Sequence, residues 1–286
     1  MKLQSFTLQI FEPKKTLNFY TTVLGFRLLN KFSENNSIYY NLGFQNQIYF
    51  IQLKYTPDLS LTPYQEMALD NYWKYSIFVT DIQKTYQGIQ QRGYRIGDPY
   101  QFGDIGYLSH TTDNENHNIE FIQKTFKSNP LHTQESNPSL GLLTIRTKDP
   151  VKIVKFYEEV MGLKLYVRMY VDRGRGFTLY FLGHKNLKVP SIDIDAIENR
   201  EWMYQQSHLF IEIQHYWNSE NNPDFYLNAS DKNGLRTINF SGNLEILKKR
   251  LIANNIVYNE INDEIIFQNI DHHKISVKTA YDNDYN

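Results

Sequence analysis

Carboxylates, histidines, lysines and arginines are the candidate chemical groups of this chain, which contains no cysteine. The absence of cysteine excludes thiolate metal sites, cysteine nucleophiles and disulfides. His215 shares a strand face with Ile211 and Ile213, so we expect it to pack in the core rather than to bind a metal. His272 and His273 lie in a predicted turn, where exposure to solvent is expected.

The charge balance argues against nucleic acid and membrane as partners. The chain has 30 basic and 31 acidic residues, which leaves a net charge of −1. No apolar run approaches the length that crosses a membrane, and the first residues lack the apolar core of a signal peptide. We therefore expect a cytoplasmic protein whose partner is a small-molecule substrate or ligand. The 22 tyrosines and 18 phenylalanines predict an aromatic-rich core or pocket.

A stretch of about 25 residues occurs twice, at 5–29 and at 142–166, and the rest of the chain is organised around it. The two copies align at an offset of 137 residues, which places Phe19 on Phe156 and Pro13 on Pro150. A match of this length at one fixed offset indicates internal duplication. The 286 residues are enough for two modules with a core each.

Each copy predicts a strand, an amphipathic helix and a second strand. Phe6, Leu8 and Ile10 alternate with polar residues, which is typical of a half-buried strand. A proline then opens the helix, where its missing N–H had no partner. Gly25 and Gly162 are expected to end the helices, because a left-handed backbone is often required there.

The predicted fold class is α+β, with tandem strand-helix-strand-strand-strand repeats that form two cupped mixed sheets with helices outside. We expect the eight strands of each module to curl into one cup with a polar concave face. The first module is placed at 1–126 and the second at 139–280. The polar segment 127–138, which holds two prolines, is the predicted linker. The acidic residues after Tyr281 are expected to be frayed.

The motif D/E-P-x5-F-Y-x4-G is present twice, at 12–25 and at 149–162. This doubled unit resembles the vicinal-oxygen-chelate superfamily of glyoxalase I, extradiol dioxygenases and the fosfomycin- and bleomycin-resistance proteins. In the second module DPVKIVKFYEEVMGLKL, FTLYFLG, IEIQHYW and SDKNGLRTI resemble consecutive segments of the lactoylglutathione lyase family. That family isomerises the methylglyoxal–glutathione hemithioacetal, so the resemblance implies one divalent metal, Zn²⁺ or Ni²⁺, as cofactor.

The resemblance also implies where the metal ligands should stand. The family takes Gln or His, Glu, His and Glu from the first, fourth, fifth and eighth strands, and in tandem enzymes each site combines the two modules. One implied site has no charged ligand and is expected to bind no metal; it collects Ser5, Gln52, Thr237 (in preference to Arg236) and Ser276. The other keeps two carboxylates and collects Leu142, Lys74, Glu120 and Glu212.

In this second set the resemblance assigns Glu120 and Glu212 as metal ligands and as catalytic acid and base. Two carboxylates alone hold Zn²⁺ weakly, and the Lys74 ammonium has no lone pair and repels a cation. Lys74 could instead replace the charge of the metal beside a developing oxyanion. The alternative is a Glu–Lys–Glu ion triad in a retired site.

Three further residues are candidates near this set. Arg146 matches the arginine with which the family binds a glutathione carboxylate, so it is the predicted substrate-binding residue; the alternative is a salt bridge at the rim. His110 and His117 flank the predicted turn at 113–118 and are assigned no role.

The resemblance favours a glyoxalase I-like lyase or isomerase that acts on a small oxygenated substrate with a degenerate metal site. Neither module supplies the His, His and Glu of an extradiol dioxygenase, so that activity is excluded. The alternative is a catalytically inactive member that serves as a metal-free small-molecule binding protein. In either case we expect a monomer of two modules or a homodimer.

Overall fold

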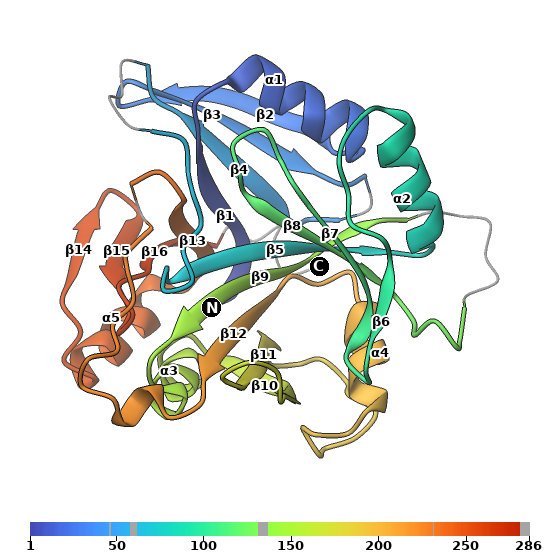
Figure 1. The fold of residues 1–286 in the computed structure, drawn as a ribbon. Coiled ribbons are helices and arrows are strands. Elements are labelled where there is room, and N and C mark those ends of the chain that lie inside the picture. Colours follow the sequence, from blue (N-terminus) through green and yellow to red (C-terminus); the bar gives the residue numbers. More distant parts are fainter. Residues whose placement is uncertain (46, 58–61, 131–136, 231, 281–286) are drawn as a thin grey trace.

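Two mixed sheets of eight strands each make up most of the computed structural model, which describes residues 1–45, 47–57, 62–130, 137–230 and 232–280 (Figure 1). The first sheet runs in the spatial order β14 (Tyr258–Ile261), β15 (Glu264–Gln268), β16 (Lys274–Thr279), β13 (Leu235–Gly242), β1 (Lys2–Ile10), β4 (Phe50–Tyr55), β3 (Ser37–Gly43) and β2 (Arg27–Glu34). The second runs in the order β10 (Leu163–Val171), β11 (Phe177–His184), β12 (Phe210–Tyr216), β9 (Ser139–Thr147), β5 (Tyr72–Val79), β8 (Asn118–Gln123), β7 (Gly106–Thr112) and β6 (Tyr100–Phe102).

Each sheet contains four strands from each half of the chain. β1 pairs with β13 at the centre of the first sheet, and β9 pairs with β5 at the centre of the second. The α+β class with two mixed sheets is confirmed, whereas the expectation of eight strands from one module in each sheet is wrong. The module boundaries remain a prediction, and residues 131–136 of the predicted linker and 281–286 of the predicted tail lie outside the described residues.

The repeated helices begin and end where the sequence predicts. The prolines stand at the first helical positions, and Gly25 and Gly162 follow the helices with φ of 79° and 72°. In both copies the last turn widens into a π-helical turn. The helical segments are α1 (Pro13–Asn18), η1 (Phe19–Val23), α2 (Ile82–Gln91), α3 (Pro150–Lys155), η2 (Phe156–Val160), α4 (Glu198–Tyr204), η3 (Ser219–Asn221) and α5 (Leu244–Ala253).

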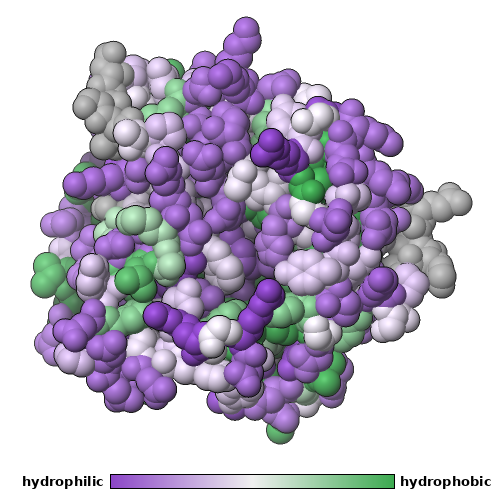
Figure 2. Space-filling model, in the orientation of Figure 1, coloured by the Kyte–Doolittle hydropathy of each residue, from purple (hydrophilic) through white to green (hydrophobic). Residues whose placement is uncertain are grey.

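Aromatic side chains fill the core, as the composition predicts. The largest fully buried side chains are all tyrosine or phenylalanine. Phe6 of the first sheet contacts Tyr75 of the second, with ring centroids 5.7 Å apart, so one core cluster joins the two sheets. The face drawn in Figure 2 is mostly hydrophilic, with hydrophobic residues in small separate groups. In the part of the chain that the structure describes, no helix has the length and hydrophobicity to cross a membrane.

The short helix α4 lies in the insertion between β11 and β12 and packs on the second sheet (Figure 1). Its residues Met203 and Tyr204 join an apolar cluster with Phe78, Leu142 and Phe210. Phe78, like Lys74, lies on the face of β5 opposite to the main core, by the alternation of side chains along a strand. The expectation of a polar concave face is therefore wrong at this end of the second sheet, where α4 covers apolar residues.

A turn near the end of the second half ties that half to the first. In this turn Asn269 accepts hydrogen bonds from the backbone of Asp271 and His273. His273 is buried, and its Nε2 is 2.8 Å from the carbonyl oxygen of Asn71. The predicted exposure of His273 is therefore wrong, because its ring links the turn to the start of β5.

Candidate functional site

Four neighbouring strands of the second sheet place Glu212, Thr144, Lys74 and Glu120 in a row. β12 sets Glu212 opposite Thr144 of β9, and β9 sets Thr144 opposite Lys74 of β5. On the other side of β5, Ser76 lies opposite Glu120 of β8. Because side chains two residues apart share a strand face, Lys74 and Ser76 both point toward the carboxylates.

The Lys74 ammonium lies between the two carboxylates. Its Nζ donates a hydrogen bond to Glu120 Oε2 and lies 3.3 Å from Glu212 Oε2. Ser76 Oγ donates to Glu120 Oε2 at 2.7 Å, and Thr144 donates to Glu212 Oε2. Lys74, Glu120 and Glu212 are only 3%, 5% and 2% exposed. The structure thus brings together the three residues predicted from the sequence; their catalytic and metal-binding roles remain predictions.

Burial and the neighbouring charges shift the pKa values of the three groups in different directions. Burial lowers the pKa of Lys74, but the two carboxylates outweigh this effect and leave its pKa raised. Burial raises the pKa of Glu120, but Lys74 and His110 outweigh it and hold that pKa well below its usual range. The pKa of Glu212 is raised, first by burial and then by the charge of Glu120, against the opposite effect of Lys74. Lys74 and Glu120 therefore form the ion pair, and Glu212 is the group that takes up a proton more readily.

His110 is a member of this cluster to which sequence reasoning gave no role. Its Nε2 is 3.0 Å from Glu120 Oε1, and its side chain is 42% exposed. An open groove of about 750 Å³ borders the cluster at His110 and Asn118. The signal was available, because the turn at 113–118 closes a hairpin in which His110 lies directly opposite Glu120.

A β-bulge at Trp73 connects this cluster to Arg146. The register of β5 against β9 shifts between Tyr72 and Lys74, so Trp73 has no partner in the ladder. Its ring centroid lies 4.8 Å from Lys74 Nζ and 5.1 Å from Arg146 Cζ. Both cations contact the same aromatic ring, which attracts them through its quadrupole.

Arg146 is buried and holds the segment before β5. Its Nη2 is 2.6 Å from Glu66 Oε1, and its Nε donates to Gln214 Oε1 at 2.9 Å. Its Nη1 donates to the carbonyl oxygens of residues 67, 70 and 72. Arg146 is therefore bonded on every nitrogen within the chain, and binding of a substrate carboxylate, which remains a prediction, requires the displacement of Glu66.

The residues present do not fit the divalent metal that the resemblance implies. A catalytic Zn²⁺ takes three or more N, O or S ligands from the protein. No group of three His, Cys, Asp or Glu side chains that could hold a metal ion occurs among the described residues. Lys74, with its raised pKa, also places a positive charge where the two carboxylates would have to meet a cation. Leu142, the fourth implied position, is buried in the apolar cluster beside α4.

The other implied set lies in the first sheet, where Ser5 and Gln52 belong to a neutral hydrogen-bond network. Asn239 donates to Ser5 and to Thr7, and Thr7 donates to Gln52. Ser276 donates to Glu264, a carboxylate that the sequence reasoning did not include. Thr237, preferred over Arg236 from the sequence, pairs with Thr7, and the register shift leaves Arg236 outside the ladder with β1; the choice between them as a ligand position remains a prediction.

Comparison with known proteins finds a family match in the first half of the chain. Residues 2–121 match the family model described as Glyoxalase/Bleomycin resistance protein/Dioxygenase superfamily. These residues, which include the first copy of the motif, therefore have the sequence of a domain of this superfamily.

Two named relatives are similar to part of the chain. The chain is 38% identical over 88 residues to glyoxalase I of Saccharomyces cerevisiae, which is 31% of this chain and 25% of that protein. It is 34% identical over 99 residues to lactoylglutathione lyase of Pseudomonas aeruginosa, which is 34% of this chain and 53% of that protein. These matches span between a quarter and about half of the relatives.

The same fold occurs in a solved glyoxalase I. The crystal structure of glyoxalase I from Zea mays superposes with a TM-score of 0.72 over 97% of this chain and 92% of that chain. The sequence identity is 16%, so this similarity establishes the fold of the whole chain and no activity.

Proposed function

We propose that the chain is a glyoxalase-type isomerase or lyase in which a buried ammonium takes the place of the metal ion. The observation that carries this proposal is the position of Lys74 between Glu120 and Glu212 on the concave face of the second sheet. Matches to proteins named glyoxalase I and lactoylglutathione lyase support the reaction class.

Glu212 is the proposed proton-transfer group. A general base works best when its pKa lies near the operating pH, and Glu212 is the carboxylate whose pKa is raised. Glu120, whose pKa is lowered, remains ionised and keeps Lys74 charged. In the isomerisation of an α-hydroxycarbonyl compound, Glu212 would take a proton from the carbon that bears the hydroxyl and return it to the carbonyl carbon. The hydroxyl proton passes to the carbonyl oxygen, so the atoms balance and no oxidant or reductant is required.

Lys74 is the proposed stabiliser of the intermediate. Removing a proton beside a carbonyl leaves negative charge on oxygen, and a fixed cation in a buried site stabilises such charge more than it would in water. Among the described residues, two carboxylates accept hydrogen bonds from the Lys74 ammonium. An ammonium has three N–H donors. The third donor is available for a substrate oxygen. His110 reaches the open groove, so we propose that the substrate approaches from that side.

A metal-free small-molecule binding protein is the second candidate, and two observations favour it. Arg146 is paired with Glu66, so the position implied for a substrate carboxylate is already filled. The side chains of α4 cover one end of the concave face. This function needs no proton transfer and therefore no particular role for Glu212.

A measurement of methylglyoxal–glutathione hemithioacetal turnover distinguishes the proposed enzyme from the metal-free binding protein. We expect turnover by the purified chain without added metal, a loss of about 100-fold or more in Glu212→Gln, and no change in Glu245→Gln, which alters an exposed carboxylate. If the chain shows no turnover either with or without Zn²⁺ or Ni²⁺, the proposed enzymatic function is overturned. Stoichiometric metal in the purified chain that disappears in Glu212→Gln would overturn the role given to Lys74.

A further inference from the structure

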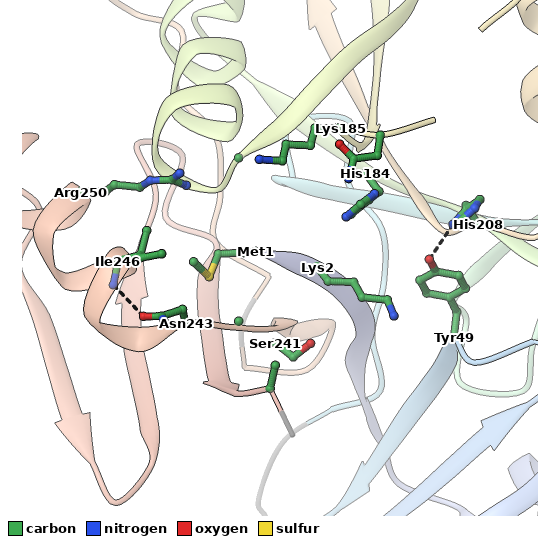
Figure 3. A pocket seen from close by; sticks show the side chains of 14 residues that line it. Met1, Lys2, Tyr49, His184, Lys185, His208, Ser241, Asn243, Ile246 and Arg250 are labelled. Carbon is green, nitrogen blue, oxygen red and sulfur yellow. Dashed lines mark hydrogen bonds between the residues drawn. The ribbon is translucent and has the colours of Figure 1, made fainter. Parts of the chain in front are cut away.

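A second pocket, of about 500 Å³, lies away from the Lys74 cluster and shares no residue with it (Figure 3). The end of β11, the start of β1, the end of β13 and the start of α5 meet there. In Figure 3 Arg250, Lys185 and His184 extend toward the space in which Met1 lies, with Lys2 beyond it and Ser241 and Asn243 on the opposite side. The pocket is therefore built from both halves of the chain.

The described residues that line this pocket carry positive charge and no carboxylate. Lys2, Lys185 and Arg250 are among them, together with His184 and His208, and none of the lining residues is Asp or Glu. In the part of the chain that the structure describes, neither Lys185 nor Arg250 forms an ion pair with a carboxylate. Among the described residues, the lining of this pocket therefore contains no carboxylate that neutralises Lys185 or Arg250.

The two histidines that line the pocket have lowered pKa values. Burial, and after it the neighbouring positive charges, lower the pKa of His184. Burial also lowers the pKa of His208, with His184 and Lys2 contributing. His208 Nδ1 lies 2.7 Å from the hydroxyl of Tyr49, which orients its ring at the pocket wall.

The backbone N–H groups at the N-terminus of α5 add a partial positive charge, and Glu245 of the same turn pairs with Lys248 and does not line the pocket. Asn243 caps this ten-residue helix, and its side chain accepts a hydrogen bond from the backbone of Ile246 at 3.0 Å. Asn243 and Ile246 both line the pocket. The first turn of a helix carries a partial positive charge and favours anions.

An unpartnered hydroxyl points to a ligand independently of these charges. Ser241 is 3% exposed and lines the pocket, and its Oγ has no hydrogen-bond partner among the described residues. A buried hydroxyl without a partner is costly, and an oxygen atom of a ligand would satisfy it. Arg250 is held in place by the bond from its Nη1 to the carbonyl oxygen of Val160 at 3.0 Å, which leaves the rest of its guanidinium for other contacts.

We propose that this pocket binds the phosphate group of a small phosphorylated molecule. A phosphate offers several acceptor oxygens and up to two negative charges, which match Arg250, Lys185, the Ser241 hydroxyl and the first turn of α5. The volume is that of a small-molecule site, larger than a bare anion needs. The proposal does not depend on the reaction assigned to the Lys74 cluster.

Isothermal titration calorimetry of the full chain with inorganic phosphate and with glycerol phosphate tests this site at low ionic strength. We expect both to bind, the ester more tightly, and Lys185→Gln and Arg250→Gln to weaken the binding about tenfold. Lys249→Gln is the matched control, because Lys249 is an exposed residue of the same helix. Lys185 forms no hydrogen bond with other described residues, so its replacement should leave the fold intact and serves if Arg250→Gln is unstable.

Two results would overturn the site. One is the absence of binding by either compound up to about 10 mM. The other is equal weakening by Lys249→Gln and Lys185→Gln, which would mean attraction to general surface charge. If inorganic phosphate bound with the same affinity as glycerol phosphate, the proposal of an organic ligand would be overturned, and the pocket would be a site for an inorganic anion.

Discussion

Lys74 and Glu212 are 138 residues apart in the chain, yet the Nζ of the first lies 3.3 Å from Oε2 of the second. Two strand pairings produce this contact, since β9 lies between β5 and β12 and Thr144 is opposite both residues. Glu120 completes the arrangement from the other side of β5. A buried cation thus lies between two carboxylates, and the chemistry proposed for the site depends on it.

Replacement of Lys74 by methionine should destabilise the fold. Two carboxylates would then lie buried without a cation, and removal of one partner from a buried ion pair costs about 3–5 kcal/mol. Urea denaturation at neutral pH measures the loss in the free energy of unfolding. The loss should shrink as the pH falls, because the carboxylates of the variant can take up protons.

The control for this variant is Lys15→Met. Lys15 pairs with Glu12 on the surface, with both side chains at least half exposed, and such pairs contribute under about 1 kcal/mol. If Lys74→Met and Lys15→Met were equally stable, the ion triad would have no structural role.

Replacement of Lys74 by histidine should create a metal site. An imidazole at this position removes the ammonium charge and adds a nitrogen ligand to Glu120 and Glu212, with His110 beside them. We expect micromolar or tighter binding of Zn²⁺ or Ni²⁺ by calorimetry, and no comparable binding by the natural sequence. Lys74→Gln, which removes the charge without adding a ligand of this kind, is the control. Equal affinities of the histidine and glutamine variants would contradict the geometry.

Local patterns in the sequence predicted much of this site. The alternation of side chains and the glycines after the helices belong to short segments, so the repeated strand and helix are readable from sequence alone. The resemblance to the lactoylglutathione lyase family located the two carboxylates, Glu120 through the turn at 113–118 and Glu212 through the segment IEIQHYW. Contacts between these segments follow once the two halves are placed beside each other.

The features that sequence analysis missed depend on packing between distant segments. The exchange of strands between the halves is set by the pairing of β1 with β13 and of β9 with β5, and no local pattern encodes it. The position of α4 depends on Tyr204, which packs against Phe78 and donates to the carbonyl oxygen of residue 105. The pairing of Arg146 with Glu66 joins residues 80 positions apart.

Release of Arg146 from Glu66 should expose a carboxylate-binding group. Glu66→Gln removes the charge that pairs with Arg146 at 2.6 Å and keeps the shape of the side chain. We expect glutathione, as a probe with two carboxylates, to bind about tenfold more tightly to this variant. Calorimetry measures the change, and Glu260→Gln, at an exposed carboxylate, is the control. Unchanged affinity would mean that Arg146 only holds the segment before β5.

Arg146→Met tests that structural role separately. The guanidinium is buried and satisfies Gln214 and three backbone carbonyls, so its loss leaves several acceptors without a donor. We expect a loss of roughly 3 kcal/mol in the free energy of unfolding. Arg168→Met, at a partly exposed ion pair with Asp195, should cost under about 1 kcal/mol. Similar losses in the two variants would contradict the role assigned to Arg146.

The turn that holds Asp271 and His273 should give two opposite pH dependences of stability. Burial lowers the pKa of His273 from 6.5 to about 4, and burial raises the pKa of Asp271 from 3.8 to about 6. Between these values the unfolded chain binds the His273 proton more strongly, so that group makes stability rise with pH. The folded chain binds the Asp271 proton more strongly, so that group makes stability fall with pH. Each contributes roughly 3 kcal/mol across the range, and the two largely offset each other.

Variants that remove one group should therefore reveal the other. In Asp271→Asn we expect the free energy of unfolding to rise more steeply between pH 4 and 6 than in the natural sequence. In His273→Gln we expect it to rise less steeply or to fall, since only the carboxyl remains. Urea denaturation at several pH values measures both slopes, and the difference between them does not depend on titrating groups elsewhere. Identical slopes in the two variants would show that neither group changes its proton affinity on folding.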